Sequence, residues 1–304
     1  MKILLFGANG QVGTELRRSL VPLGELVATT RSGLLPDGSA CIAADFDAPS
    51  SLPAVIDRVA PDIVVNAAAY TAVDRAEGDA DAAFRANADA PAQIAATCAA
   101  RDVLLVHYST DYVFDGSATR PYREDDPVDP LGVYGASKLA GEHAIRDSGA
   151  RHLIFRTAWV YAAHGHNFLR TMLRLAGERD EVRVVADQVG APTPAGLIAD
   201  GTARALRQPP TRSGLWHLVA TGQTSWHGFA EAIFAGAHAR GLLERIPRVV
   251  PITTSDYPTP ARRPGWSVLD ITRLQDDFEI RPVAWQDALG SVLDDMAGTA
   301  GDAR

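Results

Sequence analysis

The sequence predicts a doubly wound α/β fold, in which helices cover both faces of a parallel sheet, with a second, smaller mixed α/β lobe. Three observations support this prediction. Short apolar runs alternate with longer alanine-rich or amphipathic segments through the first half of the chain. A glycine-rich turn follows the first of these runs. After Thr157 the alternation becomes irregular, which indicates that the chain leaves the main sheet.

The apolar runs predict the strands of the main sheet. Residues 2–6 end at a glycine and are too few for a helix, so they are expected to form a buried parallel strand. The segments between the runs are long enough for right-handed crossover helices. Residues 79–101 predict one long helix with a kink or break at Pro91. The further strands are expected at residues 26–29, 41–44, 63–65, 103–106 and 153–155.

The second half of the chain predicts excursions between the sheet and a smaller lobe. Helices are expected at 167–176 and 196–206, and strands at 182–185 and 215–219. From residue 225 onward we expect a helix, a proline-rich loop at 257–264 and another helix, together forming a cap over the sheet. The predicted division is a dinucleotide-binding domain of residues 1–160, rejoined by about 186–222, and a substrate domain of about 161–185 and 223–304.

Composition narrows the class of protein. The chain has 304 residues, a net charge of −8 and a pI near 5.5, which argue against a nucleic-acid or anionic-membrane partner. Cys41 and Cys98 lie far apart without metal-type spacing, so we expect two reduced cysteines. The first apolar run is too short for a signal peptide, and no run approaches the ~20 residues of a membrane span. A cytoplasmic protein is predicted.

Gly7, Gly10 and Gly13 follow the first strand and open a helix. Glycines let the backbone approach a pyrophosphate, and the helix N-terminus offers free amides. The motif therefore predicts a dinucleotide site that includes Gln11 and Val12. The alternative is a tight strand-to-helix turn without a ligand.

The end of the second strand bears on the choice of nucleotide. An acidic residue commonly binds the adenosine ribose there, whereas this chain has Thr30 and Arg31. Arg31 is suited to a 2′-phosphate, so NADPH is favoured over NADH. The alternative is a solvated loop arginine. Asp45 and Phe46 are expected beside the adenine.

Small side chains close the fourth strand. Ala67, Ala68 and Ala69 let a cofactor lie against the backbone, although alanines also simply pack a helix onto a sheet. At the end of the fifth strand, Thr110 is expected to hydrogen-bond a substrate oxygen and Asp111 a sugar hydroxyl or the loop. The alternative is that Ser109 and Thr110 only cap the following loop.

Tyr134 and Lys138 predict acid catalysis. Their four-residue spacing puts both on one helix face, where the lysine is expected to lower the tyrosine pKa from about 10. Lys138 is one of only two lysines in the chain, which suggests a need for a compact ammonium rather than a guanidinium. The alternative is a surface tyrosine one turn before a lysine.

Two further pairs of residues could bind a ligand. Arg262 and Arg263, between prolines, are candidates to bind a substrate diphosphate, or are ordinary exposed charges. His164 and His166 lack a third ligand nearby and are interpreted as loop residues, so no metal ligand is assigned.

Together these motifs resemble the dTDP-4-dehydrorhamnose reductases of the extended short-chain dehydrogenase/reductase superfamily, from residue 1 to about 290. The segments that carry the resemblance are 6–7, 10–13, 65–69, 108–114, 134–135, 138–142, 155–157, 159–161, 167–168, 188, 190–193 and 258–264. A member of the family carries an aspartate where Thr30 stands, and this departure favours NADPH.

The resemblance implies a Rossmann fold and the last step of dTDP-L-rhamnose synthesis, which serves cell-surface polysaccharide such as lipopolysaccharide O-antigen. It implies that Tyr134 donates the proton, that Lys138 holds the nicotinamide ribose and that Thr110 tunes the tyrosine. It also implies a magnesium ion at a homodimer interface. The residues expected to line the dinucleotide are Gly7, Gly10, Gln11, Val12, Gly13, Thr30, Arg31, Asp45, Phe46, Ala67, Ala68, Ala69, Tyr134 and Lys138. Those expected to bind substrate are Thr110, Asp111, Trp159, Asn167, Arg262 and Arg263.

Two other functions stay open at this point. One is a nucleotide-sugar epimerase of the same fold, which keeps NAD bound through its cycle. The other is a non-catalytic regulatory subunit that senses a dinucleotide, and the joint presence of Thr110, Tyr134 and Lys138 argues against it.

Overall fold

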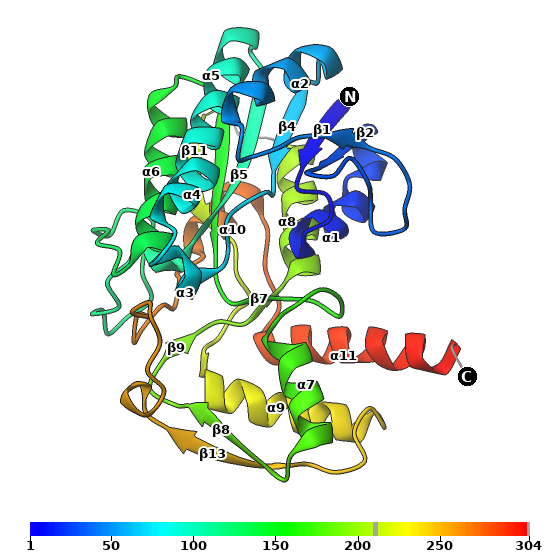
Figure 1. The fold of residues 1–304 in the computed structure, drawn as a ribbon, viewed down its shortest axis with the longest axis vertical. Helices are drawn as coiled ribbons and strands as arrows, with labels where there is room; N and C mark the ends of the chain where they lie inside the picture. Colours follow the sequence, from blue (N-terminus) through cyan, green and yellow to red (C-terminus); the bar gives the residue numbers. More distant parts are fainter. Residues whose placement is uncertain (209–211, 303–304) are drawn as a thin grey trace.

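A parallel sheet forms the centre of the upper lobe of the molecule (Figure 1). The structure is a computed structural model and describes residues 1–208 and 212–302. The seven strands stand in the order β11-β6-β5-β4-β1-β2-β3, and every neighbouring pair is parallel. All six strands predicted for this sheet are confirmed, and the strand predicted at 215–219 joins its edge as β11. The bounds are β1 Lys2–Phe6, β2 Glu25–Thr30, β3 Ile42–Ala43, β4 Ile63–Asn66, β5 Leu104–Thr110, β6 His152–Thr157 and β11 Gly214–His217.

Helices cover both faces of the sheet, as the doubly wound prediction requires. One face packs against α1 (Gln11–Ser19) and α8 (Ala195–Arg207). The other face packs against α2 (Leu52–Val59), α5 (Ala90–Arg101) and α6 (Val133–Asp147). Figure 1 shows these two layers on opposite sides of the strands. Their apolar side chains form two continuous cores, one on each face. Short helical turns lie at Val21–Leu23, Pro49–Ser51, Val73–Ala76 (α3), Asp111–Val113 and Thr254–Asp256.

The segment predicted as one helix over 79–101 is divided by a π-helical turn. It consists of α4 (Ala80–Phe84), the π turn Arg85–Asp89 and α5, with Pro91 in the first turn of α5. Proline lacks the N–H that an uninterrupted helix needs, so the irregularity falls just before it. The turn places Asn87 where its amide bonds both backbone groups of Tyr70 and the Ser137 hydroxyl. Through Asn87, the π turn thus links the loop that contains Tyr70 to α6.

The second lobe occupies the lower half of Figure 1. Its core is built around Tyr161, Phe229 and Leu289. The elements are α7 (Phe168–Glu178), β8 (Glu181–Val185), α9 (Trp226–Ala239), β13 (Arg248–Ile252) and α11 (Trp285–Asp302). β13 pairs in parallel with β8 and was not expected from the sequence. Short pairs join the lobes, β7 (Val160–Tyr161) with β10 (Thr193–Pro194) and β9 (Val189–Gly190) with β12 (Thr224–Ser225).

The assignment of all of 223–304 to the second lobe differs from the structure at one place. Helix α10 (Thr272–Phe278) lies against the main sheet, and Leu274 and Ile280 belong to its core. Trp216 of β11 explains this position, because its ring contacts Phe278 and its Nε1 donates to Asp277 at 2.9 Å. The other domain boundaries remain proposals.

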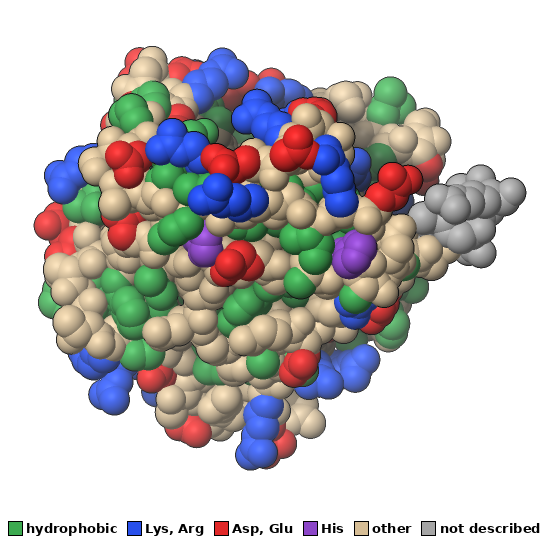
Figure 2. Space-filling model, turned by 90° about the horizontal axis from the view of Figure 1, so that it is seen from below, with side chains coloured by type: hydrophobic (Ala, Val, Ile, Leu, Met, Phe, Trp, Pro, Cys, Tyr) green, Lys and Arg blue, Asp and Glu red, His purple; other side chains and the backbone are tan. Residues whose placement is uncertain are grey.

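The surface of the second lobe carries charges of both signs. Figure 2 views the molecule from below and shows basic side chains interspersed with acidic ones, with hydrophobic side chains between them. Within residues 1–208 and 212–302, no helix is both long and apolar enough to cross a membrane.

A buried ion pair fixes α6 to the sheet. Arg156 of β6 donates to both carboxylate oxygens of Glu142, at 2.9 and 2.7 Å, and the two side chains are 3% and 0% exposed. The guanidinium also lies 5.0 Å from the centre of the Phe114 ring.

Replacing Glu142 with glutamine is expected to destabilise the fold by about 3–5 kcal/mol, because it leaves a buried guanidinium without its counterion. Urea unfolding measures the difference in free energy. The control is Glu178→Gln, which breaks the exposed pair with Arg174 and should cost no more than about 1 kcal/mol. Equal effects in the two variants would contradict the role given to the buried pair.

Candidate active site

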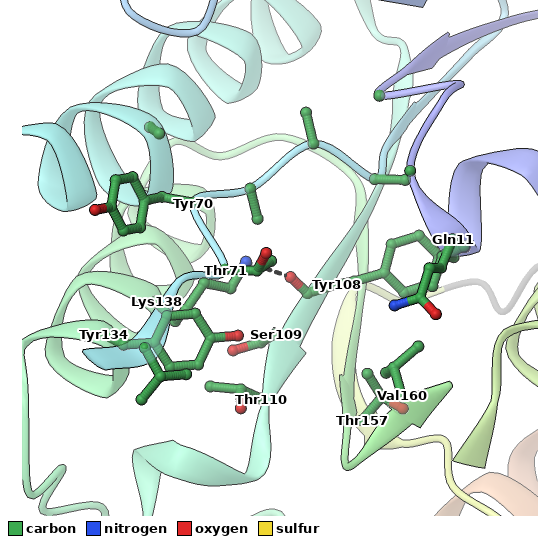
Figure 3. A pocket seen from close by; sticks show the side chains of 18 of the residues that line it. Gln11, Tyr70, Thr71, Tyr108, Ser109, Thr110, Tyr134, Lys138, Thr157 and Val160 are labelled. Carbon is green, nitrogen blue, oxygen red and sulfur yellow. Dashed lines mark hydrogen bonds between the residues drawn. The ribbon is translucent and has the colours of Figure 1, made fainter. Parts of the chain in front are cut away.

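A cleft of about 860 Å³ lies at the carboxyl ends of the strands, between the sheet and the second lobe (Figure 3). Doubly wound folds bind ligands at this edge. Of the residues expected from the sequence, those that line it are Gly7, Gly10, Gln11, Val12, Thr30, Arg31, Phe46, Ala67, Ala68, Ala69, Thr110, Asp111, Tyr134, Lys138 and Trp159. Lining residues that were not expected include Tyr70, Tyr108, Ser109, Thr157, His166 and Trp226.

The glycine loop brings backbone amides to the floor of the cleft. Gly7 has a φ of +77°, and a Cβ there would lie 2.6 Å from the Ala68 nitrogen. A Cβ on Gly13 would lie 2.0 Å from the Gly7 carbonyl oxygen. Gly13 therefore lets α1 start directly against the loop, although it does not line the cleft itself. The free amides at the start of α1 suit a pyrophosphate.

The end of the cleft beside β2 carries one exposed arginine. Arg31 lies 3.5 Å from an Asp45 carboxylate oxygen and 3.3 Å from one of Asp47. Thr30 is buried, and its hydroxyl bonds both backbone groups of Leu34 instead of facing a ligand. Phe46 lies edge-on to Phe6 in the wall. Asp45 contacts Arg31 but lies outside the cleft lining, where Asp47 takes its place.

Tyr134 stands on the first turn of α6 and faces the cleft. Removal from water raises its pKa to about 12, and hydrogen bonding to Thr110 acts in the opposite direction. The expectation that Lys138 lowers this pKa is wrong for the structure. The Lys138 ammonium is directed at the Tyr108 carbonyl oxygen, 2.6 Å away, rather than at the phenol. Tyr134 is therefore protonated near neutral pH, which is the state of a proton donor.

Lys138 is enclosed between α6 and β5. Its side chain is 2% exposed, and Figure 3 marks its bond to Tyr108. Burial lowers its pKa to about 8, and the carboxylate of Glu142 acts in the opposite direction. The site has room for a compact ammonium with one fixed acceptor.

Hydroxyl groups line the end of β5. The Thr110 hydroxyl donates to Asp111 at 3.0 Å and accepts from the Tyr112 amide at 3.1 Å. Burial raises the Asp111 pKa to about 6. In the part of the chain that the structure describes, the buried hydroxyls of Ser109 and Thr157 have no partner. They give the cleft wall unused hydrogen-bonding capacity, and Figure 3 shows Ser109 beside Tyr134.

An aromatic pair closes the side of the cleft formed by the second lobe. Trp159 adopts a φ of +49° and stacks on Trp226, with ring centres 3.5 Å apart and planes 4° from parallel. A Cβ on Gly190 would lie 2.6 Å from the Trp159 ring, so only glycine leaves room for it. Trp226 was missed because a tryptophan at the start of a distant helix carries no local signal of its neighbours.

Three residues expected to bind substrate lie outside the cleft lining. Asn167 caps α7, and its amide donates to Gln11, so it positions a cleft residue. Arg263 donates to Asp74 at 2.7 Å, because the proline-rich loop packs against the turn that contains Asp74. Arg262 lines a separate narrow crevice behind Tyr134.

The histidine pair is a loop feature, as expected. His164 contacts Glu15 at 2.8 Å, and His166 lines the cleft. Over residues 1–208 and 212–302, no three His, Cys, Asp or Glu side chains are grouped to hold a metal ion.

Comparison with known proteins gives a consistent result. The family model described as the RmlD substrate binding domain matches residues 1–297. A dTDP-4-dehydrorhamnose reductase of Burkholderia thailandensis is 50% identical, over 97% of this chain and 99% of that protein. A protein of the same name from Salmonella typhimurium is 45% identical, over 98% and 99% of the two chains.

Solved structures agree. The fold matches a dTDP-4-dehydrorhamnose reductase of Clostridium acetobutylicum with a TM-score of 0.87 and 35% identity, over 97% of this chain and 99% of that one. It also matches the Bacillus anthracis protein of that name in complex with NADP, with a TM-score of 0.87, 31% identity and the same coverage. A UDP-glucose 4-epimerase of Thermus thermophilus, 22% identical over 98% and 99% of the chains with a TM-score of 0.78, shares the fold.

Proposed function

Because this chain belongs to the RmlD family of dTDP-4-dehydrorhamnose reductases, we propose that it reduces the 4-keto group of dTDP-4-dehydro-L-rhamnose to give dTDP-L-rhamnose. The observation that carries the proposal is the single cleft in which a glycine loop, Thr110, Tyr134 and Lys138 come together. Such a cleft joins a dinucleotide site to a proton donor, as reduction of a ketone requires.

In this reaction the nicotinamide supplies a hydride to carbon 4 of the sugar. Tyr134 donates its proton to the ketone oxygen, and its raised pKa keeps that proton available. Thr110 lies beside the phenol in Figure 3 and counteracts part of the rise in its pKa. The Lys138 ammonium favours the negative charge that develops on the phenol as the proton leaves. Trp159 and Asp111 contribute an aromatic wall and a buried acceptor for the sugar.

Turnover is expected to depend on the protonation of Lys138. Since the ammonium form is the active one, kcat should fall as the pH rises through the Lys138 pKa of about 8. Tyr134 does not produce this decline, because its pKa is about 12. A pH profile of kcat at saturating substrate measures the effect. A rate that is constant up to pH 10 would refute the role of the ammonium.

Arg31 is proposed to favour NADPH through the 2′-phosphate. Arg31→Ala is expected to raise the KM for NADPH about tenfold while changing the KM for NADH little, since one charge-assisted contact is worth roughly 1.5–3 kcal/mol before competition from Asp45 and Asp47. Initial rates with each nucleotide test this. Arg174→Ala, on the far lobe, is the control. A parent chain that prefers NADH would contradict the assignment.

The substrate assignment has its own test. Purified protein is assayed for NADPH oxidation on freshly generated dTDP-4-dehydro-L-rhamnose and, separately, on its unepimerised 4-keto precursor. We expect oxidation of one NADPH per sugar reduced with the first compound and a much lower rate with the second. An epimerase would instead turn over without net oxidation of added nucleotide, and a regulatory subunit would bind it without turnover.

Three further features remain proposals. A cytoplasmic location is expected from the sequence, and a homodimer with a magnesium ion at its interface is implied by the family resemblance. Sedimentation with and without EDTA tests the last two. No residue of this chain is assigned to the metal, because the described residues include no suitable cluster.

A further inference from the structure

A wholly buried histidine lies directly behind Lys138. His107 of β5 is 0% exposed, and its Nε2 lies 3.4 Å from the Lys138 Nζ. Its other ring nitrogen, Nδ1, lies 3.1 Å from the amide nitrogen of Asn66, the residue beside it on β4. The three side chains form a line from β4 to the cleft. The sequence alone predicts no role for His107.

The orientation of Asn66 determines which ring nitrogen of His107 carries the proton. The Ala68 backbone amide donates to the Asn66 Oδ1 at 3.1 Å, so the NH₂ group of Asn66 must face His107. An NH₂ group only donates, and His107 Nδ1 must therefore accept. A neutral imidazole then carries its proton on Nε2, which points at Lys138.

We propose that His107 is a positioning residue for this reaction, which directs an Nε2–H at Lys138 and so holds the lysine nitrogen in place and favours its neutral amine. An amine can accept from Nε2–H and still donate to the Tyr108 carbonyl, whereas an ammonium would set two donors against each other. This inference rests on the proposed function, in which the ammonium form of Lys138 is the active one, so that His107 limits the pH range over which this form persists.

The charged and titratable groups around Lys138 are consistent with this effect of His107 on its amine and ammonium forms. Burial and Lys138 both lower the His107 pKa well below its usual value, so the ring stays neutral. Glu142, one turn along α6, favours the ammonium, although it is paired with Arg156 of β6. Asp111, Tyr112 and Tyr134 are further titratable groups at this end of the cleft, and the Asp111 carboxylate raises the pKa of both phenols. His107 thus acts on the protonation of Lys138 in the opposite direction to Glu142. Lys138 loses its proton at about pH 8.

The first test reads the tautomer without any turnover. Long-range ¹H–¹⁵N spectra of ¹⁵N-histidine-labelled protein distinguish Nε2–H from Nδ1–H rings, and a His107→Phe sample assigns the signal. We expect a neutral Nε2–H ring for His107 from about pH 6 to pH 9. An Nδ1–H ring, or a charged one at pH 7, would overturn the proposal even if the enzyme reduced its substrate as proposed.

The second test reverses the tautomer. In Asn66→Asp the carboxylate accepts from the Ala68 amide and from an Nδ1–H, so Nε2 presents a lone pair that favours the ammonium. The alkaline decline of kcat should move up by about one pH unit. In the double variant with His107→Phe most of that shift should vanish, because the remaining effect is the distant charge alone. An equal shift in the presence and absence of the His107 ring nitrogens would overturn the proposed effect of His107 on Lys138.

The third test separates positioning from simple packing. His107→Phe keeps the ring volume but removes the Nε2–H that opposes the ammonium, so the alkaline decline of kcat should move to higher pH with KM nearly unchanged. The matched control is His217→Phe, another wholly buried strand histidine, whose Nδ1 lies 3.0 Å from the Asp270 carbonyl oxygen, away from Lys138. It should lower the melting temperature without moving the pH profile. A His107→Phe enzyme with the parental pH profile would refute the role.

Discussion

Replacing Tyr134 with phenylalanine is expected to lower kcat at least about a hundredfold, the usual scale of positioned acid catalysis. The substitution removes one oxygen from a ring whose edge-on contact with Tyr112 has centres 5.8 Å apart, so the cleft keeps its shape. NADPH binding should therefore change by less than about threefold, because the glycine loop and Arg31 are untouched. Stopped-flow rates and fluorescence titration with NADPH provide the two measurements.

The matched control for that variant is Tyr122→Phe. Its hydroxyl accepts from the Ala118 amide and donates to Asp115, away from the cleft. It should affect stability and leave kcat close to the parental value. A Tyr134→Phe enzyme that turns over at more than a third of the parental rate would remove Tyr134 as the proton donor.

Lys138→Arg is expected to be nearly as damaging as Lys138→Met, with kcat lowered about a hundredfold or more in both. The lysine is enclosed and bonds one carbonyl oxygen at 2.6 Å with His107 behind it. A guanidinium is broader and needs several acceptors, so preserving the charge does not preserve the site. Single-turnover rates at saturating nucleotide separate this loss from weaker binding.

The chain contains a natural control for this substitution. Lys2, the other lysine, lies at the opposite end of the sheet and donates to the Val59 carbonyl oxygen at 3.3 Å. Lys2→Arg should leave kcat unchanged. If Lys138→Arg retained most of the activity, the compactness of the ammonium would not be what the site requires.

Much of the fold could be predicted because its signals are local. An apolar run that ends in glycine identifies β1, and the repetition of such runs identifies the parallel sheet. Strand β13 was not predicted because Arg248–Ile252 includes a proline and pairs with β8, which lies far away along the chain. Helix α10 was misplaced because its contact with the main sheet depends on Trp216, which no spacing reveals.

The residues of the candidate site also fall into those that the sequence predicts and those that it does not. Gly7, Thr110, Tyr134 and Lys138 were predictable because strand ends converge and four-residue spacing defines a helix face. The direction of the Tyr134 pKa shift was not, because burial outweighs a lysine whose ammonium is directed elsewhere. The position of Arg263 was not predictable either, because it is set by a hydrogen bond to Asp74, which lies far away along the chain.

The most direct test of the central claim follows the hydride itself. The protein is incubated with dTDP-4-dehydro-L-rhamnose and NADPH that carries deuterium at nicotinamide carbon 4, and the product is examined by ¹H NMR and mass spectrometry. The account predicts dTDP-L-rhamnose with one deuterium at sugar carbon 4 and one NADP⁺ released per turnover. Deuterium elsewhere on the sugar, or conversion of the sugar without release of oxidised nucleotide, would contradict it.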